Sequence, residues 1–313
     1  MDNKLSLISA KKQKLDGFRP LPQELVKNLE EWFKIELTYT SNAIEGNTLT
    51  RAETALVVEK GITVAGKSLK EHLEATNHVE ALDYIKSLVS KKRQDISVQD
   101  ILDINKLILS NIEGENAGRY RTQHARLTGS ETILPNPVKI PELMEGFILW
   151  LQGDNLDHPI KIAADAHFKL VSIHPFPDGN GRTSRLLMNL ILMQEGYPPA
   201  IIRKEERLAY INSLEKGQVA QNLEDFYDLI YEASDRSLDI YLEALEPARE
   251  SLRAPAPEQR FYTTDEIANI LQVDPESVRR YVRSGKLKAV KLGGKFIRIE
   301  KADLQNFIES LKT

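Results

Sequence analysis

Apolar residues recur every three to four positions through most of the chain, which is the spacing of one face of an α-helix. The clearest example lies between residues 22 and 44, where Leu25, Leu29 and Phe33 lead on to Leu37. The same spacing predicts further helices over residues 51–60, 68–90, 97–111, 141–151, 159–172, 182–195, 205–218 and 223–245. Because strands and helices do not alternate, the body of the protein is predicted to be mainly α-helical.

Three stretches depart from the helical pattern. Between residues 121 and 137, short extended runs flank Gly129, which predicts a small β-hairpin. Residues 246–259 contain three prolines and few large apolar side chains, a composition typical of a semi-rigid linker. Beyond it, two strands are predicted around Gly293-Gly294. The chain therefore divides into a helical N-terminal region (1–115), a core (116–245), a linker (246–260) and a C-terminal domain (261–313).

The composition is that of an ordinary folded protein. Of the 313 residues, 41% are hydrophobic and 28% are charged, so the chain can bury a sizeable core. The absence of cysteine excludes disulfides, thiolate metal sites and a cysteine nucleophile. No stretch approaches the roughly 18 apolar residues that a membrane span requires. We therefore expect a cytoplasmic protein without a membrane partner.

The charge is unevenly distributed along the chain. A net charge of -4 argues against a protein that binds nucleic acid over its whole surface. From Arg260 to Lys301, however, ten Lys and Arg residues stand against five Asp and Glu residues, a balance of +5 that leaves -9 elsewhere. The C-terminal domain is thus basic and the rest of the chain acidic.

Residues 174–185, His-Pro-Phe-Pro-Asp-Gly-Asn-Gly-Arg-Thr-Ser-Arg, combine groups that suit phosphate chemistry. Prolines restrict the loop, glycines permit unusual dihedral angles, and a helix resumes near Arg182. The main-chain N–H groups at that helix start favour an anion such as a polyphosphate. The residues that supply them are Gly179, Asn180 and Gly181.

Four side chains of the same segment supply the remaining chemistry. Arg182 and Arg185 are three residues apart, so both can reach phosphates of one ligand. Asp178 is a hard oxygen ligand of the kind that holds Mg²⁺ together with substrate phosphates. His174 can act as a general base near neutral pH. Each feature alone is commonly structural, but their combination within twelve residues indicates phosphoryl or nucleotidyl transfer.

The segment also resembles, at every defined position, the signature of Fic-domain proteins, His-x-Phe-x-Asp/Glu-Gly-Asn-Gly-Arg-x-x-Arg. The resemblance covers most of residues 20–245, including Gly118-Arg-Tyr-Arg121 and Ile133-Leu-Pro. It implies a helical Fic catalytic core with a hairpin flap. It also implies a protein adenylyltransferase, which transfers AMP from ATP to a Ser, Thr or Tyr hydroxyl of a target protein or of itself.

The resemblance assigns a role to each residue of the motif. His174 would deprotonate the target hydroxyl, and Asp178 would hold Mg²⁺. Asn180 with its neighbouring amides would bind the α- and β-phosphates, while Arg182 and Arg185 would orient the β- and γ-phosphates. The implied nucleotide-binding set is Glu45, Asp178, Gly179, Asn180, Gly181, Arg182, Thr183, Ser184, Arg185, Tyr210 and Ile211, of which the last two would line the adenine pocket. The implied flap, which would dock the target by strand addition, is Ser130, Glu131, Thr132 and Ile133. A homodimer is a further analogy.

Residues 41–46, Ser-Asn-Ala-Ile-Glu-Gly, resemble an inhibitory motif of many Fic proteins, Ser/Thr-x-x-x-Glu-Gly/Asn, in which Ser41 and Glu45 are the defined positions. Glu45 would then face Arg185. A buried carboxylate bidentate on that guanidinium would remove the partner of the γ-phosphate. Two alternatives remain open: Glu45 merely ends a surface helix, or it orients water for hydrolysis that removes AMP from a modified protein.

The C-terminal domain resembles the winged helix-turn-helix of the excisionase and MerR-like families. Its second predicted helix carries Arg279, Arg280 and Arg283 and would enter the DNA major groove. Near the wing, the residues expected to contact phosphates are Lys291, Lys295 and Arg298. Alternatively, the domain serves protein contacts or dimerisation. The whole chain could also be a DNA-binding regulator whose Fic body senses nucleotide.

Overall fold

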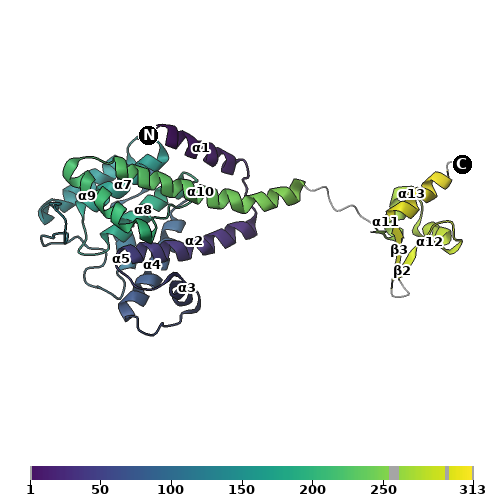
Figure 1. Cartoon of the computed structure of the whole chain (residues 1–313), viewed down its shortest axis with the longest axis horizontal. Helices are drawn as coiled ribbons and strands as arrows, with labels where there is room; N and C mark the ends of the chain where they lie inside the picture. The colour runs from purple at the N-terminus through teal and green to yellow at the C-terminus, as the bar shows by residue number, and fades with distance from the viewer. Residues whose placement is uncertain (1, 254–260, 293–295, 312–313) are drawn as a thin grey trace. The chain divides into compact units, whose positions relative to one another are not determined.

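The computed structural model describes residues 2–253, 261–292 and 296–311 (Figure 1). The chain forms two compact units, Met1–Leu245 and Glu246–Thr313. Among the described residues, none of the helices is both long and apolar enough to cross a membrane.

The first unit is built from helices, which confirms the predicted mainly α-helical class. Ten α-helices follow one another in the described part of the chain as far as Arg253: α1 (Asp2–Asp16), α2 (Gln23–Ile44), α3 (Arg51–Lys60), α4 (Leu69–Ser87), α5 (Val98–Ile108), α6 (Ile140–Gln152), α7 (Pro159–Ile173), α8 (Asn180–Gln194), α9 (Arg207–Ala220) and α10 (Glu224–Arg253). Single 3₁₀ turns lie at Arg93–Asp95, Pro137–Lys139 and Lys204–Glu206.

Helix α8 is the central element of this unit. Its apolar side chains from Leu186 to Leu192 are at most 1% exposed, and α7, α5, α4 and α2 pack against it. Burying one such side chain contributes roughly 1.5–3 kcal/mol. The buried helix therefore holds its first turn, which carries the end of the 174–185 motif, in a fixed place.

Local signals set where several helices begin. Thr50, Ser68 and Ser97 form capping boxes with the acidic residue three positions later, at the starts of α3, α4 and α5. Each cap satisfies N–H groups that the first turn leaves without an intrahelical partner, a contribution of about 1 kcal/mol.

Helix α1 was not predicted from the apolar pattern. It buries Ile8 and Leu15 and lies along α10 (Figure 1). Its Lys4 contacts Asp228 at 3.1 Å, and Lys11 contacts Asp235 at 2.7 Å. Ion pairs with a helix more than 200 residues away cannot be predicted from local periodicity.

The β-hairpin expected between residues 121 and 137 is wrong as secondary structure. The structure describes this whole segment and shows an irregular loop with a turn at Gly129, without paired strands. The loop is held by side chains of α9 rather than by a second strand: Glu215 accepts hydrogen bonds from Ser130 Oγ and from the main-chain N–H of Glu131.

The predicted linker begins later than expected. The backbone of α10 continues through residues 246–253, because Ala-Arg-Glu-Ser-Leu-Arg after Pro247 is a helix-favouring sequence. The rest of the predicted linker, residues 254–260, lies outside the described residues.

The second unit contains β1 (Phe261–Tyr262), α11 (Thr264–Leu271), α12 (Pro275–Arg283), β2 (Val290–Leu292), β3 (Phe296–Glu300) and α13 (Lys301–Ser310). The two predicted strands are present as the antiparallel pair β2 and β3, and β1 adds to the other edge of β3. Ile267, Val278, Ile299 and Phe307 meet in its small core. Strand β1 and helix α13 were not predicted.

Candidate active site

The 174–185 motif forms the turn between α7 and α8. His174 ends α7 in the left-handed conformation, at φ 50° and ψ 57°. Gly179 precedes α8 at φ 79°, where a side chain would be strained and would also meet Asn105. A left-handed histidine is uncommon and requires surrounding structure to hold it.

Contacts within the motif hold this turn in shape. The side-chain oxygen of Asn180 accepts from Phe176 N at 2.9 Å, and its Nδ2 donates to Phe176 O at 2.8 Å. Phe176 itself is fully buried. The side chain of Asn180 therefore stabilises the turn by binding the Phe176 backbone. Only the main-chain N–H of Asn180 remains for the phosphate contact predicted from the sequence.

The main-chain N–H groups at the start of α8 differ slightly from the predicted set. The first intrahelical bond is donated by Thr183 N to Gly179 O, so the N–H groups of residues 180–182 precede it. Gly179 N, by contrast, donates to Asp178 Oδ1 at 2.6 Å. The N–H groups without an intrahelical acceptor are thus those of residues 180–182, one residue further along than the predicted set of 179–181.

Two buried residues to which the sequence analysis assigned no role, Asn105 and Arg121, hydrogen-bond to the backbone of the motif. Asn105 donates to Asp178 O at 3.0 Å and accepts from Gly118 N at 3.0 Å. Arg121 donates from N to Pro175 O and from Nε to His174 O, both at 2.8 Å. The signal for Asn105 was present, because a polar residue stands on the apolar face of a helix among isoleucines.

Glu45 follows the last residue of α2 and contacts Arg185, as the motif implied. Arg185 Nη2 donates to Glu45 Oε1 at 2.7 Å. Arg185 also donates to both oxygens of Ser41, from Nε to Oγ at 3.0 Å and from Nη2 to the carbonyl at 2.9 Å. Tyr210 accepts from Nη1 at 3.3 Å.

The expected form of the contact between Glu45 and Arg185 is wrong in two respects. It uses one carboxylate oxygen instead of two, because Ser41 occupies the Nε edge of the guanidinium. The Glu45 side chain is also 38% exposed rather than buried, whereas that of Arg185 is 6% exposed. The arginine is the fixed partner and the glutamate the accessible one.

Arg182 points to a different partner from Arg185. It is buried, with its Nη1 3.3 Å from Glu74 of α4 and its Nη2 3.4 Å from Asp178 Oδ2. Thr183 Oγ1 donates to Gly179 O, and Ser184 is fully buried. The side chains of residues 183 and 184 thus face the interior.

A pocket of about 540 Å³ opens beside the motif. Of the predicted site residues it is lined by Glu45, Ser130, His174, Gly181, Arg185, Tyr210 and Ile211. Those outside its lining are Ser41, Glu131, Thr132, Ile133, Asp178, Gly179, Asn180, Arg182, Thr183 and Ser184. Its size suits a nucleotide-sized ligand.

Two features of the pocket wall bear on chemistry. Burial lowers the pKa of His174 below its ordinary value of 6.5, and the charge of Arg121 acts in the same direction. The imidazole is therefore neutral at neutral pH, as a base must be. At Gly181, an added Cβ would overlap Glu45 Oε1 and lie 3.1 Å from Arg185 Nη1, so the close approach of these groups requires glycine.

Comparison with known proteins places this geometry in a family. Residues 95–192 match the Fic/DOC family, and residues 261–312 match a helix-turn-helix domain. Fic-1 from C. elegans superposes with a TM-score of 0.73 and 32% identity, covering 79% of this chain and 73% of that one. This chain belongs to the Fic family.

Two further relatives support the assignment. A Fic domain-containing signalling protein from Bacteroides thetaiotaomicron has a TM-score of 0.70 and 30% identity, over 78% of this chain and 98% of that one. The protein adenylyltransferase Fic of Nematostella vectensis is 41% identical over 206 residues, 65% of this chain and 48% of that protein. The chain thus spans about half the length of the curated relatives it matches.

The segment predicted as the flap, residues 130–133, borders the pocket through Ser130 and contacts α9. Glu215 Oε1 accepts from Ser130 Oγ at 2.8 Å and from Glu131 N at 2.7 Å. These two hydrogen bonds lower the pKa of the Glu215 carboxyl. Ile133 at the end of the flap is 95% exposed, an apolar side chain available to a partner.

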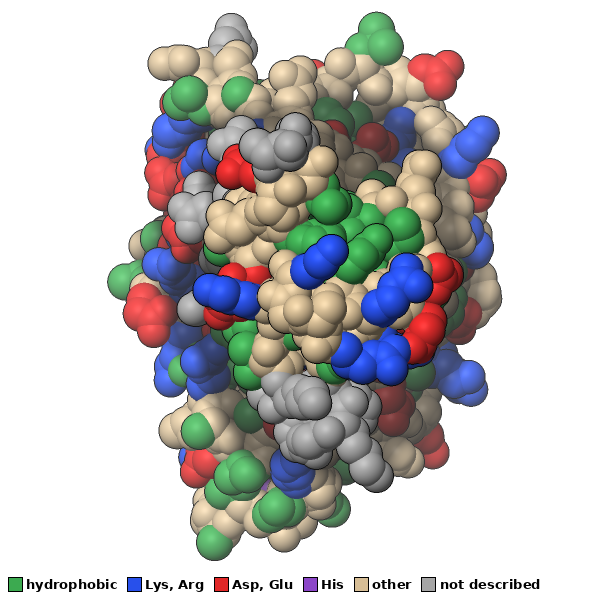
Figure 2. Space-filling model, turned by 90° about the vertical axis from the view of Figure 1, so that its right-hand side faces the viewer, with side chains coloured by type: hydrophobic (Ala, Val, Ile, Leu, Met, Phe, Trp, Pro, Cys, Tyr) green, Lys and Arg blue, Asp and Glu red, His purple; other side chains and the backbone are tan. Residues whose placement is uncertain are grey.

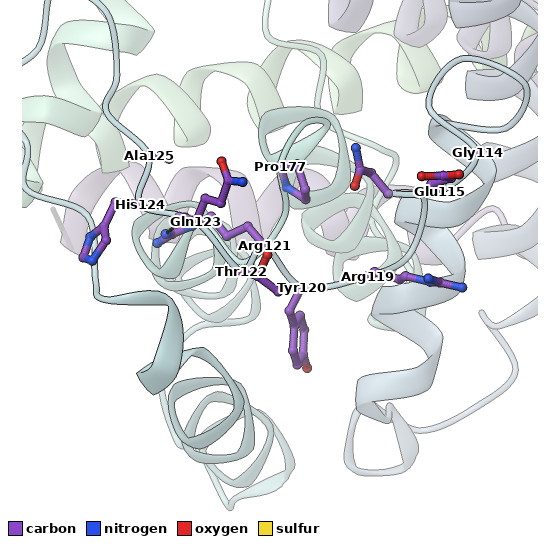
Figure 3. A pocket seen from close by; sticks show the side chains of 11 residues that line it. Gly114, Glu115, Arg119, Tyr120, Arg121, Thr122, Gln123, His124, Ala125 and Pro177 are labelled. Carbon is purple, nitrogen blue, oxygen red and sulfur yellow. Dashed lines mark hydrogen bonds between the residues drawn. The ribbon is translucent and has the colours of Figure 1, made fainter.

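A second pocket of about 840 Å³ lies on the loop from Gly114 to Ala125 and reaches the Fic motif at Pro177 (Figure 3). Arg119, Tyr120 and His124 project from this loop (Figure 3). The lining of this second pocket is mainly polar. The pocket lies next to the motif loop but shares no lining residue with the pocket that contains His174.

The C-terminal unit of this Fic protein presents the predicted arginines on α12. Arg279 and Arg283 are exposed, and each contacts Glu276 on the same helix; Arg280 is also exposed. Arg298 lies on β3 and is half-buried. Lys291 lies in β2, and Lys295 falls outside the described residues. Figure 2 shows Lys and Arg side chains together with Asp and Glu side chains on the face turned toward the viewer.

Proposed function

We propose that this Fic protein is a protein adenylyltransferase that moves AMP from ATP to a hydroxyl side chain of a target protein. The observation that carries the proposal is the pairing, across one pocket of about 540 Å³, of a neutral histidine with a buried arginine at a helix start. That combination can activate a hydroxyl and bind a polyphosphate in the same space. The adenylyltransferase names of its relatives agree with it.

In the proposed reaction, the target hydroxyl oxygen attacks the α-phosphorus of ATP. The bond from that phosphorus to the bridging oxygen of the β-phosphate breaks, and pyrophosphate leaves. His174 takes the hydroxyl proton on Nε2, because its Nδ1 is buried. Arg121 donates a hydrogen bond to the His174 carbonyl and so holds the base in position before the substrate binds. Holding the reacting groups in the correct geometry lowers the entropic cost of reaching the transition state.

The triphosphate would be held by the start of α8 and by Arg185. The N–H groups of residues 180–182 precede the first intrahelical hydrogen bond of α8 and would donate to the phosphates. Arg185 would bind the γ-phosphate through the edge that Glu45 now occupies. Ile211, which lines the pocket, would border the adenine, whereas the Tyr210 hydroxyl contacts Arg185.

Asp178 fits the predicted magnesium role. Its side chain is 39% exposed, and its Oδ2 makes only a long contact of 3.4 Å with Arg182 Nη2. One carboxylate beside a phosphate site is the usual protein contribution to a Mg²⁺ site. When bound, the ion would neutralise charge on the α- and β-phosphates. Asp178 would hold it, and Asn105 would fix the Asp178 backbone.

We further propose that Glu45 inhibits the transfer reaction. Its carboxylate lies 2.7 Å from Arg185 Nη2, where the γ-phosphate would bind, and adds negative charge to a site for a polyanion. Since the Glu45 side chain is 38% exposed at the end of α2, its carboxylate stays in contact with solvent when it moves away from Arg185. Its departure would free the arginine for ATP.

The test compares self-labelling from radiolabelled ATP. Glu45→Gly should label at least tenfold more than the native protein, the change expected when about 1.4 kcal/mol of competing interaction is lost. Glu45→Gly/His174→Ala should lose the label. Glu24→Gly, at the exposed start of the same helix, is the matched control and should behave as the native protein. Absence of label from the Glu45→Gly protein would contradict the transferase.

A second activity is supported by the exposure of Glu45 within the His174 pocket. An accessible carboxylate there could orient water for removal of AMP from a modified protein. The native chain would then release AMP from protein labelled by the Glu45→Gly variant, and Glu45→Gly would not. Equal release by both proteins would rule this activity out.

A further inference from the structure

Besides Ser41 and Glu45, a tyrosine contacts the Arg185 guanidinium. The Tyr210 hydroxyl accepts from Arg185 Nη1 at 3.3 Å, and the guanidinium carbon lies 5.7 Å from the centre of the Tyr210 ring. Tyr210 is 3% exposed, so most of the side chain that was expected to line an adenine pocket faces the interior. Its hydroxyl contacts the arginine on a different nitrogen from the one that Glu45 uses.

The Tyr210 hydroxyl in turn contacts a buried histidine. His167 of α7 is fully buried, and its Nε2 lies 2.8 Å from the Tyr210 hydroxyl. Burial, with the nearby charge of Arg185, lowers the pKa of His167 to about 3, so the ring is neutral. Because the tyrosine oxygen accepts from Arg185, its proton is free to be donated to Nε2. The chain of donors then runs from Arg185 through Tyr210 to His167.

We propose that Tyr210 and His167 are positioning residues that keep the Arg185 guanidinium in its phosphate-binding orientation whether or not Glu45 occupies it. This inference rests on the proposed role of Arg185 with the γ-phosphate. Glu45 is the exposed partner of Arg185 and can leave, whereas Tyr210 and His167 are packed in the core and remain. When Glu45 departs, the arginine is already oriented, so ATP binds without first ordering a long side chain.

If Tyr210 orients Arg185, loss of its hydroxyl should affect only the binding of nucleotides that carry a γ-phosphate. Removing the Tyr210 hydroxyl should weaken ATP more than ADP, because only ATP carries the group that Arg185 would bind. A variant that merely loosens the fold would weaken both nucleotides alike. The ratio of the two dissociation constants therefore separates positioning from structural support.

The experiment measures ATP and ADP binding by calorimetry in a Glu45→Gly/His174→Ala background, which exposes Arg185 and prevents turnover. Addition of Tyr210→Phe should reduce the preference for ATP over ADP about tenfold, the usual worth of a hydrogen bond to a charged group. Addition of Arg185→Ala shows the full loss of that preference. Tyr231→Phe is the matched control, since Tyr231 is also buried and its hydroxyl makes no hydrogen bond to the described residues.

Changes at His167 test the second link. His167→Gln retains a side-chain acceptor for the Tyr210 proton and should keep most of the ATP preference. His167→Phe removes the acceptor and should match Tyr210→Phe, with the Tyr210→Phe result deciding if this variant does not fold.

Each outcome is decisive. Equal weakening of ATP and ADP in Tyr210→Phe, or an unchanged ratio while Arg185→Ala lowers it, overturns the positioning role. If Arg185→Ala leaves the ratio unchanged, the γ-phosphate assignment itself is wrong, and the positioning role is wrong with it.

Discussion

At the scale of single residues, the placement of the motif residues on a loop and a helix could be predicted from the sequence, but the contacts of their side chains could not. The spacing placed His174 in a loop and Arg182 and Arg185 on one face of a helix. The structure shows that Arg182 is held by Glu74 and Arg185 by Ser41 and Glu45, partners more than 100 residues away in sequence. The resemblance to Fic proteins supplied Glu45, whereas no local pattern indicated Glu74.

The His174 environment predicts the pH dependence of transfer. Since burial lowers the pKa of His174, the neutral base persists at pH values below the ordinary 6.5. The kcat/KM of the Glu45→Gly protein should fall on acidification with a midpoint below 6.5 and stay level between about pH 7 and pH 8. Self-labelling rates measured across this range provide the check. A midpoint at or above 6.5 would argue against His174 as the buried base.

The buried histidines also make the fold sensitive to acid. Burial lowers the pKa of His78 to about 3, and the charges of Arg185 and Arg182 act in the same direction. Unfolding lets this histidine take up a proton below pH 6.5, so stability is full above 6.5 and is lost as the pH falls toward 3. The expected loss is about 1.4 kcal/mol per pH unit for each such histidine.

Replacement of His78 by glutamine tests that contribution. Glutamine can keep a hydrogen bond to Thr38, which lies 3.1 Å from His78 Nδ1, but it does not titrate. Urea unfolding between pH 6 and pH 5 should then show a shallower loss of stability, by about 1.4 kcal/mol per pH unit. An identical slope in both proteins would mean that His78 is not neutral in the fold.

At the scale of elements, helices α2 to α10 followed from apolar spacing, while the structure of the flap did not follow from its turn residues. Short runs around Gly129 satisfied the pattern of a hairpin, yet the segment gains its hydrogen bonds from Glu215 and Gln218 of α9. Once side chains of a neighbouring helix satisfy the loop, a second strand is not needed. A local pattern cannot distinguish these two sources of hydrogen bonds.

The flap contact predicts a local change in hydrogen exchange. Glu215→Ala removes the acceptor for the Glu131 N–H, so that amide should exchange several-fold faster, while the helices keep their protection. Mass spectrometry of peptides covering residues 127–133 measures the effect. Lys216→Ala, which removes the neighbouring contact with Asp225, is the control and should leave the flap unchanged. Equal exchange in the Glu215→Ala and native proteins would show that the flap is held otherwise.

At the scale of the whole molecule, the charge separates an acidic body from a basic C-terminal domain, and the structure divides the chain into two units at residue 246. The helix-turn-helix match covers residues 261–312, α12 carries the three predicted arginines, and β2 and β3 are the two strands predicted on either side of Gly293-Gly294. Strand β1 was missed because it has two residues, too few for an alternation pattern, and it forms by pairing with β3. Pairing across the chain, not local preference, creates that strand.

The basic C-terminal unit leads us to expect DNA binding that depends on salt. Arg279 and Arg280 are exposed on α12, the second helix of the helix-turn-helix, so they can reach phosphates or base edges. Fluorescence anisotropy with a mixed-sequence duplex should show affinity that falls as salt rises, and the Arg279→Ala/Arg280→Ala protein should bind more weakly. If both arginines contact phosphates, its salt slope should be shallower by about two. Lys60→Ala/Lys70→Ala makes the same charge change at exposed sites of the first unit and should not alter binding. A duplex that stays unbound at low salt would instead assign this unit to protein contacts.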